Sequence, residues 1–171
     1  MARTSSRGDE RQLLKRYLSQ YYKAKEKQRV YKSRLENLQA ELRHPSITAP
    51  ALDGVSVKRG KHSKGAASLP LRIAEIEDRI QGQAEIEARV ILEIMDTLDF
   101  LPPDSTEKYI MELRHIDCMS WADIQRTTHL TRSPCYDYYN KGLDRLLTYG
   151  KVIEQLGAFE ARQRRTERDG Y

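Results

Sequence analysis

Six residues between positions 132 and 141 carry the side chains best suited to contact a nucleic acid. They are Arg132, Ser133, Tyr136, Asp137, Asn140 and Lys141. A guanidinium group can pair with a guanine edge or a phosphate, and an asparagine amide can pair with adenine. A serine hydroxyl and the free N–H groups at a helix start can hold a phosphate, and we expect Lys141 to contact the DNA backbone. The segment predicts a surface that binds double-stranded DNA, although Asp137 and Asp144 lower its positive charge.

A second group of candidates is a basic cluster in a stretch rich in proline and glycine. Residues 44–68 hold two prolines and three glycines, and they contain the cationic residues Lys58, Arg59, Lys61 and Lys64. Basic side chains on a flexible backbone can hold phosphates without reading bases. A linker that keeps the chain in solution would have the same composition, so the sequence leaves both interpretations open.

No pattern of catalytic or metal-binding residues accompanies these candidates. The four histidines are scattered without an HExxH spacing, and Cys118 and Cys135 do not form a CxxC pair. Zinc sites depend on closely spaced ligands of this kind. We therefore predict that the chain is not an enzyme and takes no metal or cofactor. We interpret His115 as a half-buried packing residue and the cysteines as thiols packed between helices in a reducing cytoplasm.

Three short amphipathic helices are predicted around the six candidates. The first has Asp104 as its N-cap and an apolar face that runs from Tyr109 to Ile116. The second begins after Ser120, which can cap its N-terminus while Asp123 reaches back to the cap. Residues 117–119 form the predicted turn between these two helices.

The third predicted helix carries the six candidates themselves. Ser133 is a suitable N-cap, and Pro134 fits the first helical position. The apolar stripe predicts that at least one of Tyr136 and Tyr139 lies in the core. Two short helices joined by a tight turn, which Leu130 pins to the core, form a helix-turn-helix, whose second helix fits the major groove of DNA.

A long helical hairpin is predicted in front of these helices. Residues 10–43 contain no Pro or Gly and carry a heptad seam of apolar residues that is interrupted at Gln28. A second seam runs from Leu69 to Leu98 and weakens at Gly82. The two seams can pair within one chain, as a coiled-coil-like hairpin, or between two chains, as a dimeric coiled coil. The sequence does not choose between these arrangements.

The predicted fold class is therefore all-α, with a long N-terminal helical hairpin followed by a C-terminal helix-turn-helix domain. Residues 1–9 are expected to form a disordered tail. Residues 10–100 form the hairpin with its flexible basic linker at 44–68, and residues 101–150 form the helix-turn-helix domain. Residues 151–171 are expected to form a charged C-terminal tail.

One part of the chain resembles region 4 of sigma-70-type factors. The resemblance covers residues 98–147 and rests on Leu101-Pro102, Leu113-Arg114-His115-Ile116, Ser120-Trp121-Ala122-Asp123-Ile124 and Thr131-Arg132-Ser133. The layout of the whole chain is similar to phage late-gene transcriptional regulators of the ArpU/RinA type. This resemblance implies a small activator that binds DNA in a bacterial host cell and has RNA polymerase as a further partner.

The charge distribution agrees with a partner of negative charge. The chain has 171 residues and a net charge of +5, but residues 1–64 hold 16 Lys and Arg against 6 Asp and Glu. Such asymmetry is typical of proteins that bind nucleic acid or an acidic partner, and a solvated helix surface explains it equally well. No apolar run reaches the length of a membrane span, and none follows the first residues as in a secretory signal. We therefore expect a cytoplasmic protein with no membrane partner.

Taken together, these patterns predict a sequence-specific DNA-binding transcriptional regulator that activates phage late genes. Two alternatives stay open. Small terminase subunits, which package DNA, also join a helix-turn-helix to long helices and form ring oligomers. The second alternative is a helical protein-interaction module, in which the helix-turn-helix serves only as a core. The sequence leaves open whether the chain forms a homo-oligomer.

Overall fold

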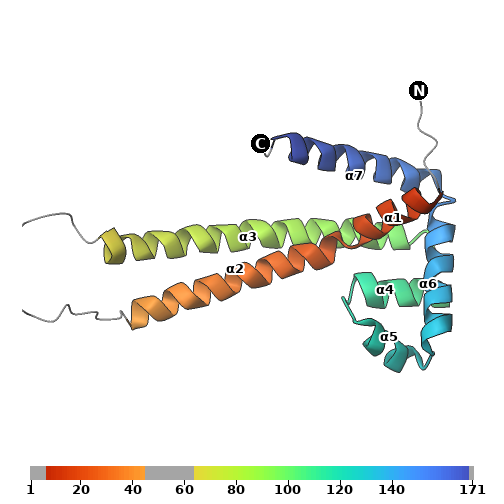
Figure 1. Cartoon of the computed structure of the whole chain (residues 1–171), viewed down its shortest axis with the longest axis horizontal. Coiled ribbons are helices and arrows are strands. Elements are labelled where there is room, and N and C mark those ends of the chain that lie inside the picture. The colour runs from red at the N-terminus through yellow and green to blue at the C-terminus, as the bar shows by residue number, and fades with distance from the viewer. Residues whose placement is uncertain (1–6, 45–63, 170–171) are drawn as a thin grey trace, which may run out of the picture. The chain divides into compact units, whose positions relative to one another are not determined.

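The computed structural model describes residues 7–44 and 64–169, and the regular elements in these ranges are helices joined by short connections (Figure 1). The described residues contain no strand and form seven helices: α1 (Arg7–Leu18), α2 (Gln20–Arg43), α3 (Lys64–Leu98), α4 (Thr106–His115), α5 (Trp121–Thr128), α6 (Arg132–Leu146) and α7 (Gly150–Asp169). The all-α fold class is confirmed. The chain divides into two compact units, one of residues 25–86 and one of the remaining residues.

The long N-terminal helix predicted over residues 10–43 is bent at Ser19, which separates α1 from α2. The Ser19 hydroxyl donates a hydrogen bond of 2.7 Å to the backbone oxygen of Lys15. A serine that bonds back to the preceding turn bends a helix. Beyond the bend the helical hydrogen bonds resume, since the Lys23 amide donates to the backbone oxygen of Ser19. Since α1 begins at Arg7, the prediction of a disordered tail over residues 1–9 is wrong for residues 7–9.

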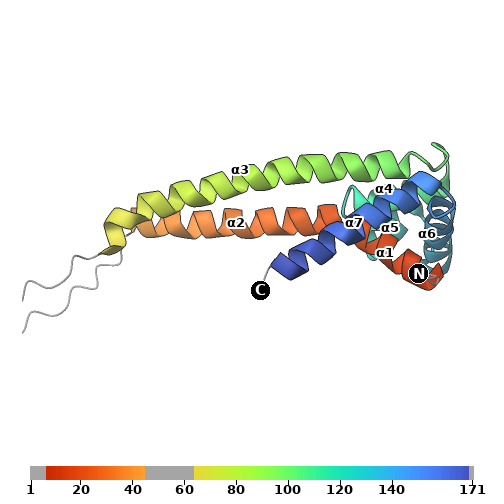
Figure 2. The same ribbon diagram turned by 90° about the horizontal axis from the view of Figure 1, so that it is seen from above.

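Within residues 25–86, α2 and the first part of α3 lie side by side and run in opposite directions (Figure 2). In the structure the two seams therefore pair within one chain. Each helix of the pair covers only one side of the other, so the seam residues are half-buried. They are Tyr31, Leu35, Leu38, Ile73, Ile76 and Ile80. Arg79 bonds to Glu75 at 2.7 Å and also to Tyr31 across the pair, and these hydrogen bonds raise the pKa of the guanidinium.

The predicted flexible linker at 44–68 is shorter than expected at its C-terminal end. Residues 64–68 belong to α3, which therefore contains Pro70 rather than beginning beside it. The helix also passes through Gly82 without interruption. Of the basic cluster, Lys64 is the first residue of α3, whereas Lys58, Arg59 and Lys61 lie outside the described residues.

The second unit has one continuous core beneath α4, α5 and α6, to which α1, the end of α3 and α7 contribute. Its central residues are almost fully buried: Leu14, Leu18, Ile94, Leu98, Ile110, Met111, Ile124, Leu143, Leu146 and Val152. α4 packs on α5 and α6, while α1 packs on both α6 and α7. Segments from both ends of the chain thus pack together with the three short helices.

The prediction of a charged tail over residues 151–171 is wrong for residues 151–169, because they belong to α7, a helix with one buried face. Val152, Leu156 and Phe159 lie in the core, and the Phe159 ring meets the edge of Tyr17 with their centroids 5.5 Å apart. Gln155 accepts a hydrogen bond of 3.2 Å from Thr97 of α3. Nearly half of the residues of α7 are charged, but its large apolar residues recur at helical spacing and meet α1.

The caps of the three short helices differ in part from the predictions. Ser105, and not Asp104, is the N-cap of α4, because its hydroxyl accepts a hydrogen bond from the Lys108 amide. Ser120 caps α5 as predicted. Thr131, and not Ser133, is the N-cap of α6, so Pro134 is the third residue of the helix. An N–H group at that position would have no partner within the helix, so the lack of one in proline is tolerated.

Gly142 of α6 allows close contact with α4. A Cβ atom at this position would lie 2.6 Å from Sδ of Met111, which is fully buried. We expect Gly142→Ala to lower the free energy of unfolding, because overpacking costs about 1–3 kcal/mol and outweighs a gain in helix propensity of about 1 kcal/mol. Gly157→Ala is the matched control, since no atom lies within 4 Å of its added Cβ, and it should stabilise. Urea unfolding measures both, and equal stabilisation by the two changes would contradict the contact.

Candidate nucleic-acid interface

The candidate surface lies on the outer side of α6, which follows α5 after a short connection at residues 129–131. His129 ends α5 with a φ of 56°, a left-handed conformation that reverses the chain direction. Leu130 packs against the core as predicted. A predicted turn over residues 117–119 between α4 and α5 is also confirmed, with Cys118 at a φ of 57°. The connection at 129–131 thus joins α5 to α6, and the turn at 117–119 joins α4 to α5.

None of the six predicted residues of α6 is buried. Arg132, Ser133, Asp137 and Lys141 are exposed, whereas Tyr136 and Asn140 are half-buried. The inward side holds the residues that pack against α4 and α5: Cys135, Tyr139, Gly142, Leu143 and Leu146. The structure thus confirms that one of the two tyrosines, Tyr139, lies in the core. It also brings four candidates together around one shallow hollow of about 470 Å³: Arg132, Ser133, Tyr136 and Asp137.

An aromatic stack supports this hollow from below. The Trp121 ring of α5 stacks on Tyr136 with a centroid distance of 4.3 Å and an interplanar angle of 29°. The Arg132 guanidinium lies 5.7 Å from the centre of the Tyr136 ring, and Arg114 lies 5.3 Å from that of Trp121. Cations above aromatic faces are attracted by the ring quadrupole. The Arg132 guanidinium thus lies near the Tyr136 ring, and both side chains line the hollow.

Trp121 was not among the residues predicted for the site, and neither was Arg11 of α1. Arg11 forms a bidentate ion pair with Asp144, in which the Nε–Oδ1 distance is 2.6 Å. Asp144 lies on α6 and would otherwise repel a phosphate. The lone tryptophan beside the Ser120 cap was a usable signal for the stack. No local pattern could have indicated a contact between residues that lie 133 positions apart.

His115 and Tyr139 hold α4 against α6 beneath the surface. The His115 ring is 5% exposed, which is deeper than the half-buried position predicted for it. Its Nε2 atom lies 3.1 Å from the Tyr139 hydroxyl, and the two rings stack. Burial first, and then the Arg114 charge, lower the pKa of His115 to about 3. The imidazole is therefore neutral at physiological pH, and burial raises the pKa of Tyr139 to about 12.

The N-terminus of α5 is fixed by a local network of polar groups. The Ser120 hydroxyl accepts from the Asp123 amide at 3.2 Å and donates to the Asp123 carboxylate at 2.6 Å. That hydrogen bond lowers the pKa of Asp123, and an ion pair with Arg126 adds to the effect. The predicted reach of Asp123 back to its cap is confirmed, and the network sets the start of the helix that carries Trp121.

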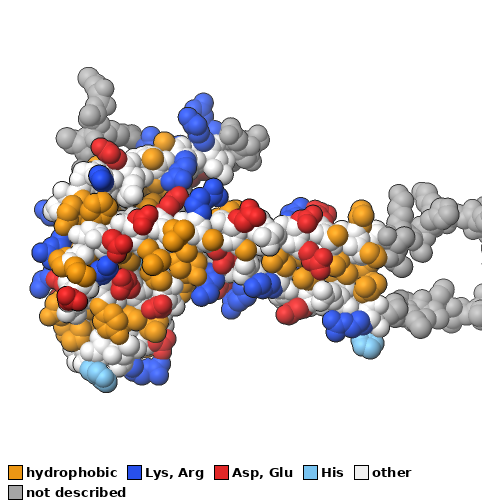
Figure 3. Space-filling view, turned by 180° about the vertical axis from the view of Figure 1, so that it is seen from behind, with side chains coloured by type: hydrophobic (Ala, Val, Ile, Leu, Met, Phe, Trp, Pro, Cys, Tyr) orange, Lys and Arg blue, Asp and Glu red, His pale blue; other side chains and the backbone are white. Residues whose placement is uncertain are grey.

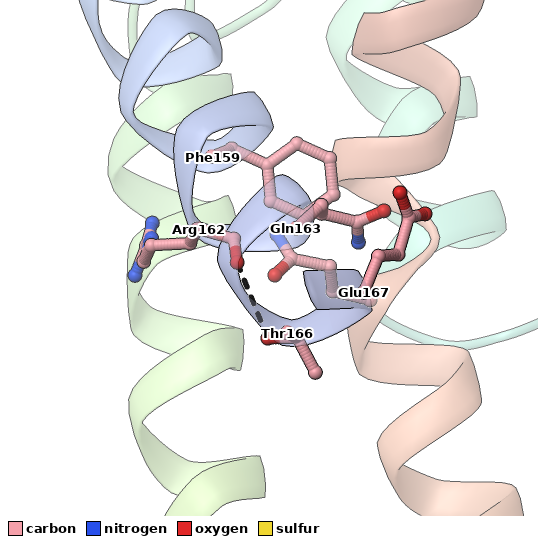
Figure 4. A pocket seen from close by; sticks show the side chains of 6 residues that line it. Phe159, Arg162, Gln163, Thr166 and Glu167 are labelled. Atoms are coloured by element: carbon pink, nitrogen blue, oxygen red, sulfur yellow. Dashed lines mark hydrogen bonds between the residues drawn. The ribbon is translucent and has the colours of Figure 1, made fainter. Parts of the chain in front are cut away.

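The charge of this unit is mixed, and a second hollow in it favours no ligand class. Figure 3 shows hydrophobic, acidic and basic side chains interleaved on one face, with no single sign of charge covering it. A groove of about 320 Å³ runs along α7 and has Phe159, Arg162, Gln163, Thr166 and Glu167 in its lining (Figure 4). The described residues contain no group of three histidine, cysteine or acidic side chains placed to hold a metal. None of their helices has the combination of length and hydrophobicity that a bilayer span requires.

The comparisons with known proteins return no match. Neither a family model nor a curated protein nor a solved structure matches this chain. What the outer side of α6 can bind therefore has to follow from its own residues.

Proposed function

We propose that this chain is a sequence-specific DNA-binding transcriptional regulator, with α5 and α6 as a helix-turn-helix and α6 as its reading helix. The observation that carries the proposal is the cluster of Arg132, Ser133, Tyr136 and Asp137 at the exposed first turns of α6. The N-terminal residues of a reading helix are those that reach base edges in the major groove. In this proposal the first turns of α6 supply both a cation and hydrogen-bonding groups at that place.

The roles of the individual side chains follow from their chemistry. Arg132, held over Tyr136, can bond to O6 and N7 of a guanine. Asn140 lies two turns further along the helix and suits adenine, while the exposed Lys141 suits a phosphate. Asp137 disfavours phosphate and can accept a hydrogen bond from the amino group of cytosine. We therefore expect the affinity of α6 to depend more on matched bases than on its charge.

The biological setting is part of the same proposal. A small activator of phage late genes, resembling the ArpU/RinA type, would act in the cytoplasm of a bacterial host. It would bind double-stranded DNA through α6, and RNA polymerase or a second copy through another surface. The resemblance of residues 98–147 to sigma-70 region 4 supports this setting.

Arg132→Ala tests the reading role. We expect it to weaken binding to the selected DNA site by about 1–3 kcal/mol, and binding to random DNA by much less, because a bidentate contact with a base discriminates among sequences. Fluorescence anisotropy with both DNAs measures the two losses. Arg126→Ala is the matched control, an exposed arginine on α5 that is paired with Asp123. It should leave the ratio of the two affinities unchanged. Equal losses on both DNAs for Arg132→Ala would remove Arg132 from the reading role.

A further inference from the structure

A stripe of three cations runs along one side of α1. Arg7, Arg11 and Lys15 are spaced by four residues and therefore lie on one side of the helix. Arg7 is exposed, and Arg11 and Lys15 are half-buried. We call these three residues the α1 stripe.

The α1 stripe follows α6. Arg11 pairs with Asp144 near the end of α6, and the Lys15 ammonium lies 5.9 Å from the centre of the Tyr139 ring in its middle. Lys15 follows Arg11 along α1, whereas Tyr139 precedes Asp144 along α6. The two helices therefore run in opposite directions where they touch. Arg7, one turn before Arg11, extends the stripe away from these contacts.

The opposite side of α1 faces α7 instead. Arg16 lines a hollow there together with Leu13 and α7 residues that include Glu160 and Glu167. Arg16 therefore has acidic neighbours that belong to another face of the unit. The chain thus offers two kinds of α1 cation, which differ in the helix they lie beside.

We propose that the α1 stripe binds the phosphodiester backbone of the DNA strand that borders the groove occupied by α6. This inference rests on the proposed function of α6. Packed helices have axes about 8–10 Å apart, and the major groove is about 12 Å wide. A helix packed beside the reading helix therefore lies outside that groove, next to the phosphates along its edge. Arg11 neutralises Asp144 at this contact, and Arg7 and Lys15 supply the cations that displace counterions from the phosphates.

The salt dependence of binding tests this inference. The double variant Arg7→Ala/Lys15→Ala should weaken binding to the selected site and to random DNA by a similar factor. The slope of log K against log salt should become shallower by roughly 1.8, which is about 0.9 for each lost phosphate contact. Arg16→Ala is the matched control, from the same helix and with the same charge, and should leave the slope unchanged. Circular dichroism and thermal unfolding of each variant verify that the fold is retained.

The outcomes separate this inference from the proposed function. If the folded double variant keeps the affinity and salt slope of the unaltered protein, the α1 stripe does not contact DNA, while specific binding by α6 stands. If Arg16→Ala flattens the slope as much as the double variant, the effect comes from total charge and the inference is also wrong. If the unaltered protein binds no DNA, the proposed function fails and the inference with it.

Discussion

Replacement of Leu143 by alanine is expected to lower the free energy of unfolding by about 2–5 kcal/mol. Leu143 is fully buried in the middle of α6, within the cluster that contains Ile110 of α4 and Ile124 of α5. Truncation removes apolar contacts and leaves a cavity that the three packed helices cannot easily close. Urea unfolding followed by circular dichroism measures the loss as a shift of the transition midpoint.

Leu92→Ala provides the control for this prediction. Leu92 lies on α3 in the same unit and is 60% exposed, so its loss should cost no more than about 0.5 kcal/mol. Comparable losses for the two variants would contradict the position of Leu143 at the centre of the core. Leu143→Ala leaves every outward residue of α6 in place. Under conditions in which the variant stays folded, it should therefore bind DNA as the unaltered protein does.

Acidification from pH 7 to pH 5 is expected to remove about 2 kcal/mol of stability through His115 alone. An unfolded histidine has a pKa of about 6.5, whereas burial lowers the pKa of His115 in the folded protein to about 3. Between these values the unfolded state binds the proton and the folded state does not. Stability is therefore present above about pH 6.5 and is lost progressively as the pH falls toward 3.

A comparison of two pH profiles isolates this contribution. The neighbouring Tyr139, with its pKa of about 12, stays neutral over the whole range. The difference between the unfolding free energies of the unaltered protein and of His115→Gln should therefore shrink by about 2 kcal/mol between pH 7 and pH 5. Parallel profiles over this range would show that His115 is not buried in its neutral form.

The sequence predicted the helices well where apolar residues recur at helical spacing. The stripes of α4, α5 and α6 indicated these helices, and the Ser120 cap and the turn before it were found where expected. Cap choice was less predictable when two suitable residues lie close together. Asp104 and Ser105 are adjacent, and only the geometry of the preceding turn makes Ser105 the residue whose hydroxyl meets the Lys108 amide.

Features that depend on contacts between distant segments could not be predicted. Nearly half of the residues of α7 are charged, and its few large apolar residues become a buried face only because α1 and α3 lie beside them. The pairing of Arg11 with Asp144 has the same origin. In the candidate surface, the residue types on α6 were visible in the sequence, whereas the Trp121 stack beneath Tyr136 required the packing of α5 on α6.

Selection of binding sites from a pool of random double-stranded DNA tests the central proposal most directly. The purified full chain, at moderate salt, should enrich one reproducible motif, and Arg132→Ala should lose the preference at one position of that motif while Arg126→Ala keeps it. Retention of DNA without any enriched motif would contradict sequence-specific reading by α6 and would favour a packaging or architectural role. Failure of the folded protein to retain any DNA would contradict the proposal that α6 is a DNA-reading helix.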